Sequence, residues 1–110
     1  VTMVVFRNFQ WGAEKRNTTL WYDDNFVGTE LNKGVEYAEM ARACGLKGVK
    51  VGTVAELEEA LKTAIEGQMQ RHETTLVEVL LNQELGEPFR RDAMKAPVQI
   101  AKINASDMAA

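Results

Sequence analysis

The middle of the chain contains a strand, a capped helix and a second strand, and this order most constrains the fold. Apolar runs at residues 46–51 and 76–81 predict the two strands. Five residues between them recur on one helical face: Val54, Leu57, Leu61, Ala64 and Ile65. Thr53 and Glu56 have the spacing of a capping box at its start, and we expect Gly67 to end the helix. Such a βαβ unit predicts parallel strands joined by a right-handed crossover.

The first 45 residues predict further elements of the same class. An apolar run at residues 4–6 predicts a strand, and a short helix follows over residues 11–16. We expect an irregular loop over residues 17–32, anchored by its aromatic rings, Trp21, Tyr22 and Phe26. A further helix is expected from about Lys33 to Cys44, with Gly45 as its stop. The predicted fold is α/β, a parallel sheet of about three strands with flanking helices.

Two regions differ in composition. Residues 1–82 have the alternating apolar and amphipathic segments of a partial α/β domain, whereas residues 83–110 are polar and interrupted by Pro88 and Pro97. We expect the second region to be an extended C-terminal tail that wraps over a surface. At 110 residues the chain amounts to one domain at most.

Charge and composition argue against several classes of function. The net charge is −3 and the basic residues are scattered among acidic ones, which disfavours nucleic acid as a partner. No apolar stretch approaches the roughly 20 residues that a membrane-spanning helix needs. Cys44 is the single cysteine, so an internal disulfide is excluded, and a reducing, cytoplasmic setting fits this usage.

The strongest functional signal is Asn8-Phe9-Gln10-Trp11-Gly12, which directly follows the first apolar run. An Asn that leaves a buried strand places an amide oxygen and turn carbonyls at the carboxyl edge of the sheet, where open α/β sheets bind ligands. This stretch resembles the second half of the thiamine diphosphate motif, in which a Gly-Asp-Gly is followed later by Asn-Asn. Residues 6–17 and 82–92 are similar, more specifically, to the sulfoacetaldehyde acetyltransferase family.

The resemblance implies a cofactor, a metal ion and residues that hold them. It makes the Asn8 side-chain oxygen and the Gln10 main-chain carbonyl ligands of Mg²⁺, and it places Trp11 and Gly12 against the diphosphate of thiamine diphosphate. Arg7 stands where the family has the first Asn of its pair, a position that the metal contact does not need. Without the longer family match, a residue that only caps the turn after a strand is the more ordinary interpretation of Asn8.

The resemblance also implies an incomplete enzyme. Its Gly-Asp-Gly and the Glu that activates the cofactor are expected upstream of Val1, so we expect no activity from this chain alone. The parent is expected to be a homo-oligomer that converts sulfoacetaldehyde and phosphate to acetyl phosphate and sulfite. Because a sheet cut partway exposes an unpaired edge, we expect the chain to self-associate. Alternatives are a related thiamine diphosphate decarboxylase, an acetohydroxy-acid synthase, and a non-catalytic α/β interaction subunit.

Other polar residues have more ordinary explanations. An anion such as phosphate would suit Arg90 and Arg91, or equally Lys15 and Arg16, although solvated charges explain both pairs. The remaining candidates are Asp23 and Asp24, which we expect in a turn, His72, which we expect at the surface, and Cys44, which we expect in the core.

Overall fold

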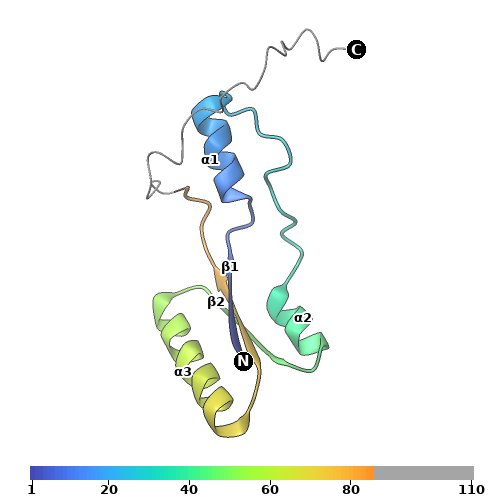
Figure 1. Ribbon diagram of the computed structural model, residues 1–110, viewed down its shortest axis with the longest axis vertical. Helices are drawn as coiled ribbons and strands as arrows, with labels where there is room; N and C mark the ends of the chain where they lie inside the picture. The colour runs from blue at the N-terminus through green and yellow to red at the C-terminus, as the bar shows by residue number, and fades with distance from the viewer. Residues whose placement is uncertain (86–110) are drawn as a thin grey trace, which may run out of the picture.

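The computed structural model describes residues 1–85, which form a three-stranded parallel sheet with helices on both faces (Figure 1). The strand order is β1-β3-β2, so β3 is central. The elements follow one another as β1 (Thr2–Arg7), α1 (Gly12–Trp21), α2 (Tyr37–Ala43), β2 (Lys47–Val51), α3 (Val54–Arg71) and β3 (Thr75–Leu80). The α/β class and the parallel sheet predicted from the sequence are confirmed.

The two faces of the sheet differ in chemistry. Val77 of β3 is level with Val4 of β1 and Val49 of β2, and Val77 packs into the cluster beneath α3. The cluster consists of the buried residues Val51, Ala64, Val77 and Val79, with Val49, Leu57, Ala60 and Leu61 packed against them. On the opposite face, which α2 covers, Glu78 is fully buried, and its neighbours in register are Val5 and Lys50.

Helix α3 begins as the sequence predicts but ends later. The Glu56 N–H donates to Thr53 Oγ1 at 3.2 Å and the Thr53 N–H donates to Glu56 Oε2 at 3.1 Å, which confirms the capping box. The expectation that Gly67 ends the helix is wrong, because α3 continues to Arg71 and His72 adopts the left-handed conformation at its end. One interior Gly costs a helix only about 1 kcal/mol. A Cβ on Gly67 would lie 2.6 Å from Glu73 Oε2, the end of a flexible side chain that can move aside.

Helix α1 and the loop after it also differ from the prediction. The helix continues to Trp21, five residues beyond the predicted end, with Thr18 Oγ1 donating back to the Glu14 carbonyl at 2.9 Å. The expectation that aromatic rings anchor the loop is wrong, since Trp21, Tyr22 and Phe26 are all exposed. Main-chain hydrogen bonds to the turn after β1 hold the loop instead.

Helix α2 is shorter than predicted and packs very closely on the sheet. It covers residues 37–43, and Gly45 follows with φ of +78°, which confirms the predicted stop. Cys44 is exposed, so its expected core position is wrong. A Cβ on Gly48 of β2 would lie 2.1 Å from the Ala38 carbonyl oxygen, so only glycine fits under α2 at this point. No helix within residues 1–85 has the length and apolar character needed to cross a membrane.

Candidate functional site

The turn that follows β1, residues 8–12, lies at the carboxyl edge of the sheet, between β1 and α1 (Figure 1). The Asn8 side-chain oxygen accepts the Gln10 N–H at 3.3 Å, which closes a small turn around Phe9. Asn8 therefore has the capping role that any Asn in this place can have. The same bond fixes its amide oxygen at the edge where a ligand of the sheet would lie.

Phe9 adopts an unfavourable backbone conformation at the centre of this turn. Its φ is +61°, in the left-handed region that a bulky side chain rarely enters. Such a conformation persists only where the surroundings impose it, and it is concentrated at functional sites. Here the Phe9 carbonyl accepts the Leu31 N–H at 2.8 Å, and the Arg7 guanidinium lies 4.5 Å from the centre of the Phe9 ring.

Gln10 is nearly buried, with 4% of its surface exposed, and its two oxygens have unusual surroundings. Its Nε2 donates to the Gln83 carbonyl at 3.0 Å, while its Oε1 is buried and has no hydrogen-bond partner among residues 1–85. Its main-chain carbonyl also accepts no hydrogen bond from the described part of the chain, because the bonds to the neighbouring loop use Phe9 and Trp11. Among residues 1–85, therefore, no donor competes with a cation for that carbonyl.

Trp11 and Gly12 form the start of α1. The Trp11 N–H donates to the Thr29 carbonyl at 2.8 Å, and its indole is 56% exposed. A Cβ on Gly12 would lie 3.4 Å from Asn8 Nδ2 and 3.8 Å from Gln10 Nε2. The glycine therefore leaves space beside both amides, at a helix end whose first N–H groups have no partner within the helix.

Arg7 forms a buried ion pair that the sequence analysis missed. Its Nη1 lies 2.6 Å from Glu78 Oε1, and its Nη2 donates to the Lys33 carbonyl at 2.7 Å. Glu78 Oε2 also accepts the Ala38 N–H at 2.8 Å, so β1, β3, α2 and the preceding loop meet at one carboxylate. The sequence signal for this pair was an acidic residue, Glu78, inside one apolar strand and a basic residue, Arg7, at the end of another.

The other candidate residues lie apart from the turn or have local partners. Lys15 forms an ion pair with Glu30, and bonds from Lys15 and Gln83 lower the pKa of the Glu30 carboxyl. Arg16 lies in α1, and Arg90 and Arg91 are outside the described residues. Asp23 and Asp24 occupy a turn with φ of +48° and +57°, and His72 is exposed at the end of α3, as predicted. Residues 1–85 contain no cluster of three or more His, Cys, Asp or Glu side chains suited to a metal ion.

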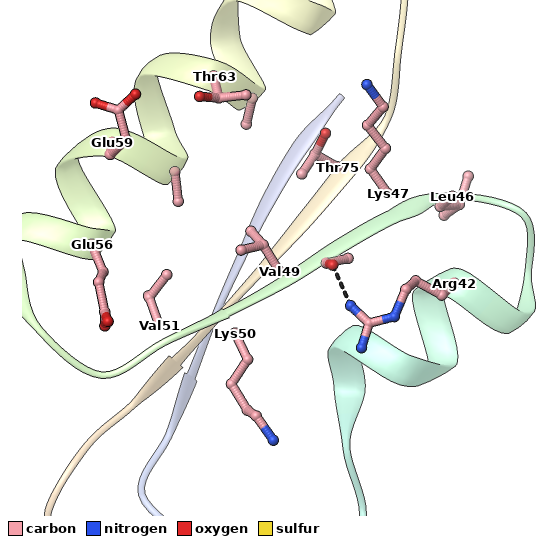
Figure 2. Close-up of a pocket in the computed structure, with 13 residues that line it drawn as sticks. Arg42, Leu46, Lys47, Val49, Lys50, Val51, Glu56, Glu59, Thr63 and Thr75 are labelled. Atoms are coloured by element: carbon pink, nitrogen blue, oxygen red, sulfur yellow. Dashed lines mark hydrogen bonds between the residues drawn. The ribbon is translucent and has the colours of Figure 1, made fainter.

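A groove of about 700 Å³ follows the open edge of β2, away from the turn. Figure 2 shows Val49 and Val51 on the α3 side of β2, with Lys50 pointing to the other side. Arg42 reaches the Gly48 carbonyl at one end of the groove. A much smaller hollow of about 60 Å³ lies beside the turn itself, lined in part by Arg7, Asn8 and Phe9.

The turn fits part of a divalent-ion site. Asn8 offers a neutral amide oxygen and Gln10 a neutral carbonyl oxygen, which are donors that Mg²⁺ accepts. A Mg²⁺ ion takes about six oxygens and commonly one or two carboxylates. The turn holds no carboxylate, so the two oxygens suit an ion whose charge is balanced by other groups, such as a diphosphate.

Comparison with known proteins gives the family of the chain. A family model described as "Thiamine pyrophosphate enzyme, C-terminal TPP binding domain" matches residues 1–79. The probable sulfoacetaldehyde acetyltransferase of Rhizobium meliloti is 68% identical over 108 residues, which are 98% of this chain and 18% of that protein. The sulfoacetaldehyde acetyltransferase of Rhodobacter capsulatus is 65% identical over 98% of the chain and 18% of its own length. The enzyme of that name from Alcaligenes xylosoxydans xylosoxydans is 42% identical over 91% of the chain and 16% of its own length. The chain thus spans less than a fifth of these relatives.

Proposed function

Because this chain belongs to the thiamine pyrophosphate enzymes, within their C-terminal TPP-binding domain, we propose that residues 8–12 hold the diphosphate end of that cofactor. The parent protein would be a sulfoacetaldehyde acetyltransferase, which forms acetyl phosphate and sulfite from sulfoacetaldehyde and phosphate. The free Gln10 carbonyl, in a turn closed by Asn8, is the single observation that carries this proposal.

Each residue of the turn has a role in this proposal. The Asn8 Oδ1 and the Gln10 carbonyl would bind Mg²⁺, and the left-handed conformation of Phe9 between them would set the positions of that side chain and that carbonyl. Gly12 leaves the space that the diphosphate needs, and Trp11 covers it from the start of α1. When bound, thiamine diphosphate supplies an electron sink for carbon–carbon bond chemistry. The residues of this turn bind and orient; none is placed to transfer a proton.

The remaining ligands and the acid–base groups are proposed to come from the rest of a longer protein. A carboxylate must complete the Mg²⁺ site, and the turn contains none. We also propose that the parent is a homo-oligomer of the cytoplasm. The free, exposed thiol of Cys44 is compatible with a reducing compartment.

The test is a calorimetric titration with thiamine diphosphate and Mg²⁺. The 110-residue chain is compared with a chimera in which it replaces the matching 108 residues of the Rhizobium meliloti relative. We expect Mg²⁺-dependent binding by the chimera and none by the chain alone. In the chimera, Asn8→Ala should weaken binding by about tenfold or more, which is the 1.4 kcal/mol that one bond to a charged group can supply. Asn17→Ala, on the exposed side of α1, is the matched control and should bind as the parent chimera does.

Each result distinguishes between the hypotheses. Unchanged binding by the Asn8→Ala chimera would refute the assignment of the turn. A chimera that does not bind the cofactor would favour a non-catalytic interaction domain. A chimera that binds and consumes 2-oxo acids, but not sulfoacetaldehyde, would favour a decarboxylase or an acetohydroxy-acid synthase.

A further inference from the structure

The segment after β3 continues to follow β1 into the turn. The Leu81 N–H donates to the Arg7 carbonyl at 2.9 Å, and two residues later the Gln83 carbonyl accepts Gln10 Nε2 at 3.0 Å. Residues 81–83 are thus aligned beside the residues that lead from β1 into the proposed metal site. Gln10, which binds to this segment through its side chain, has only 4% of its surface exposed.

Gln83 also reaches the loop on the opposite side of the turn. Its Nε2 donates to Glu30 Oε2 at 2.8 Å, while the other oxygen of Glu30 accepts Lys15 from α1. Glu30 lies opposite Gln10 in a two-residue antiparallel bridge, framed by the Trp11–Thr29 and Leu31–Phe9 main-chain bonds. One residue therefore contacts both sides of the bridge, through its carbonyl on one side and its amide on the other.

We propose that Gln83 is a positioning residue for the metal-binding turn. The Gln83 carbonyl accepts a hydrogen bond from the Gln10 side chain, and the Gln83 amide donates one to Glu30. Gln83 therefore links the two residues of the bridge from a segment outside the turn. The Gln10 carbonyl shares a peptide plane with the Trp11 N–H, which donates to Thr29 within the bridge. A closed bridge therefore holds this carbonyl in one orientation, which a metal ion of strict octahedral preference requires. The inference rests on the function proposed above, because it assigns the Gln10 carbonyl to Mg²⁺.

The first experiment needs no cofactor. Hydrogen exchange of the 110-residue chain reports the Trp11 and Leu31 amides, which form the two bonds of the bridge. Gln83→Leu keeps the carbonyl and removes the amide, and it should raise both exchange rates roughly tenfold, the lower end of the range for one hydrogen bond to a charged group. The Val79 amide of the central strand should be unaffected. Glu84→Gln, at the exposed neighbouring position, is the control and should change none of these rates.

The second experiment uses the chimera with cofactor. Gln83→Leu should weaken Mg²⁺-dependent binding of thiamine diphosphate by roughly three- to tenfold, with kcat restored at saturating cofactor. Gln83→Glu should be worse, because two carboxylates would then face each other. Combining it with Glu30→Gln reverses donor and acceptor and should recover most of the affinity, a rescue that a general loss of stability would not show.

The outcomes separate this inference from the proposed function. Unchanged exchange of the Trp11 and Leu31 amides in Gln83→Leu would overturn the inference whatever the cofactor does. Faster exchange with undiminished affinity in the chimera would also overturn it, while the cofactor site at the turn would stand. A parent chimera that binds no cofactor would overturn the proposed function, and this inference with it.

Discussion

Removal of either partner of the Arg7–Glu78 pair should destabilise this chain far more than removal of any exposed charge. Glu78 is fully buried, and its carboxylate accepts hydrogen bonds from the Arg7 guanidinium and the Ala38 N–H. Glu78→Leu leaves a guanidinium that is 7% exposed without its counter-charge. Breaking one side of a buried ion pair costs about 3–5 kcal/mol, a large part of the 5–15 kcal/mol that stabilises a typical domain.

Replacing both partners should cost less than the two single changes combined. In Arg7→Met with Glu78→Leu no buried charge remains, but the Ala38 N–H and the Lys33 carbonyl lose their partners. Each of these groups costs about 1–3 kcal/mol when unsatisfied. Each single variant already loses one of the two bonds and also leaves a charge buried without its partner, so we expect the double variant to be more stable than either single one.

The assay is urea unfolding of the 110-residue chain, followed by circular dichroism at one fixed chain concentration. The double-mutant cycle should give a coupling energy of several kcal/mol. Glu58→Leu is the control, because the Glu58–Lys62 pair is exposed on α3, and it should change the free energy of unfolding little. Additive effects of the two single changes, or single effects as small as the control, would refute the reasoning.

Three further predictions concern a helix cap, a strained residue and a sheet edge. The N–H groups of Gly52 and Thr53 lower the pKa of the Glu56 carboxyl below 4.5. The stability that the ionised carboxylate contributes is therefore complete above pH 4.5 and is lost as the pH falls through the lowered pKa. The difference in melting temperature between the parent and Glu56→Gln should vanish in acid. The free energy of unfolding of Phe9→Gly should be about 1 kcal/mol higher than that of Phe9→Ala. Both variants lose the ring, but only glycine adopts a φ of +61° without strain. Equal values would contradict the left-handed conformation. Phe6 is 66% exposed on β1, which is an edge strand of the sheet that residues 1–85 form. Sedimentation should therefore show self-association of the chain, and Phe6→Lys should reduce it. A sharply two-state monomer would argue against self-association.

The elements that the sequence predicted are those with a local cause. Thr53 and Glu56 are close together in the chain, and the capping box that they form determines where α3 begins. The apolar runs on either side determine the two strands. Gly45 ends α2 because its φ is +78°, which is again a property of one position. The family resemblance that began at Asn8 is confirmed by the family match over residues 1–79. The metal and diphosphate roles of residues 8–12 remain predictions.

The elements that the sequence missed depend on distant partners. Helix α3 passes Gly67 and ends at Arg71, where the N–H of the left-handed His72 donates to the Gly67 carbonyl. Cys44 is exposed because α2 ends at Ala43, so Cys44 lies after the part of the helix that packs on the sheet through Ala38 and Ala41. At the site, the bonds of Gln83 to Gln10 and Glu30 join residues separated by 73 and 53 positions. A pattern along the chain does not reveal such pairings, because several acids and amides are equally suitable partners until the strands are in register.

The departure of this chain from the Asn-Asn pattern has a physical explanation in the same sheet. Arg7 faces the α2 side, where it pairs with Glu78, binds the Lys33 carbonyl and lies against the Phe9 ring. The last of these contacts joins Arg7 to the strained turn, and Asn8 keeps its place through its own bond to the Gln10 N–H. Substituting Arg7 by the family's Asn would shorten the side chain and leave Glu78 buried without its cation. An Asn at position 7 and a buried carboxylate at position 78 are therefore a poor combination, and we expect Arg7→Asn to lower the free energy of unfolding by about as much as Arg7→Met.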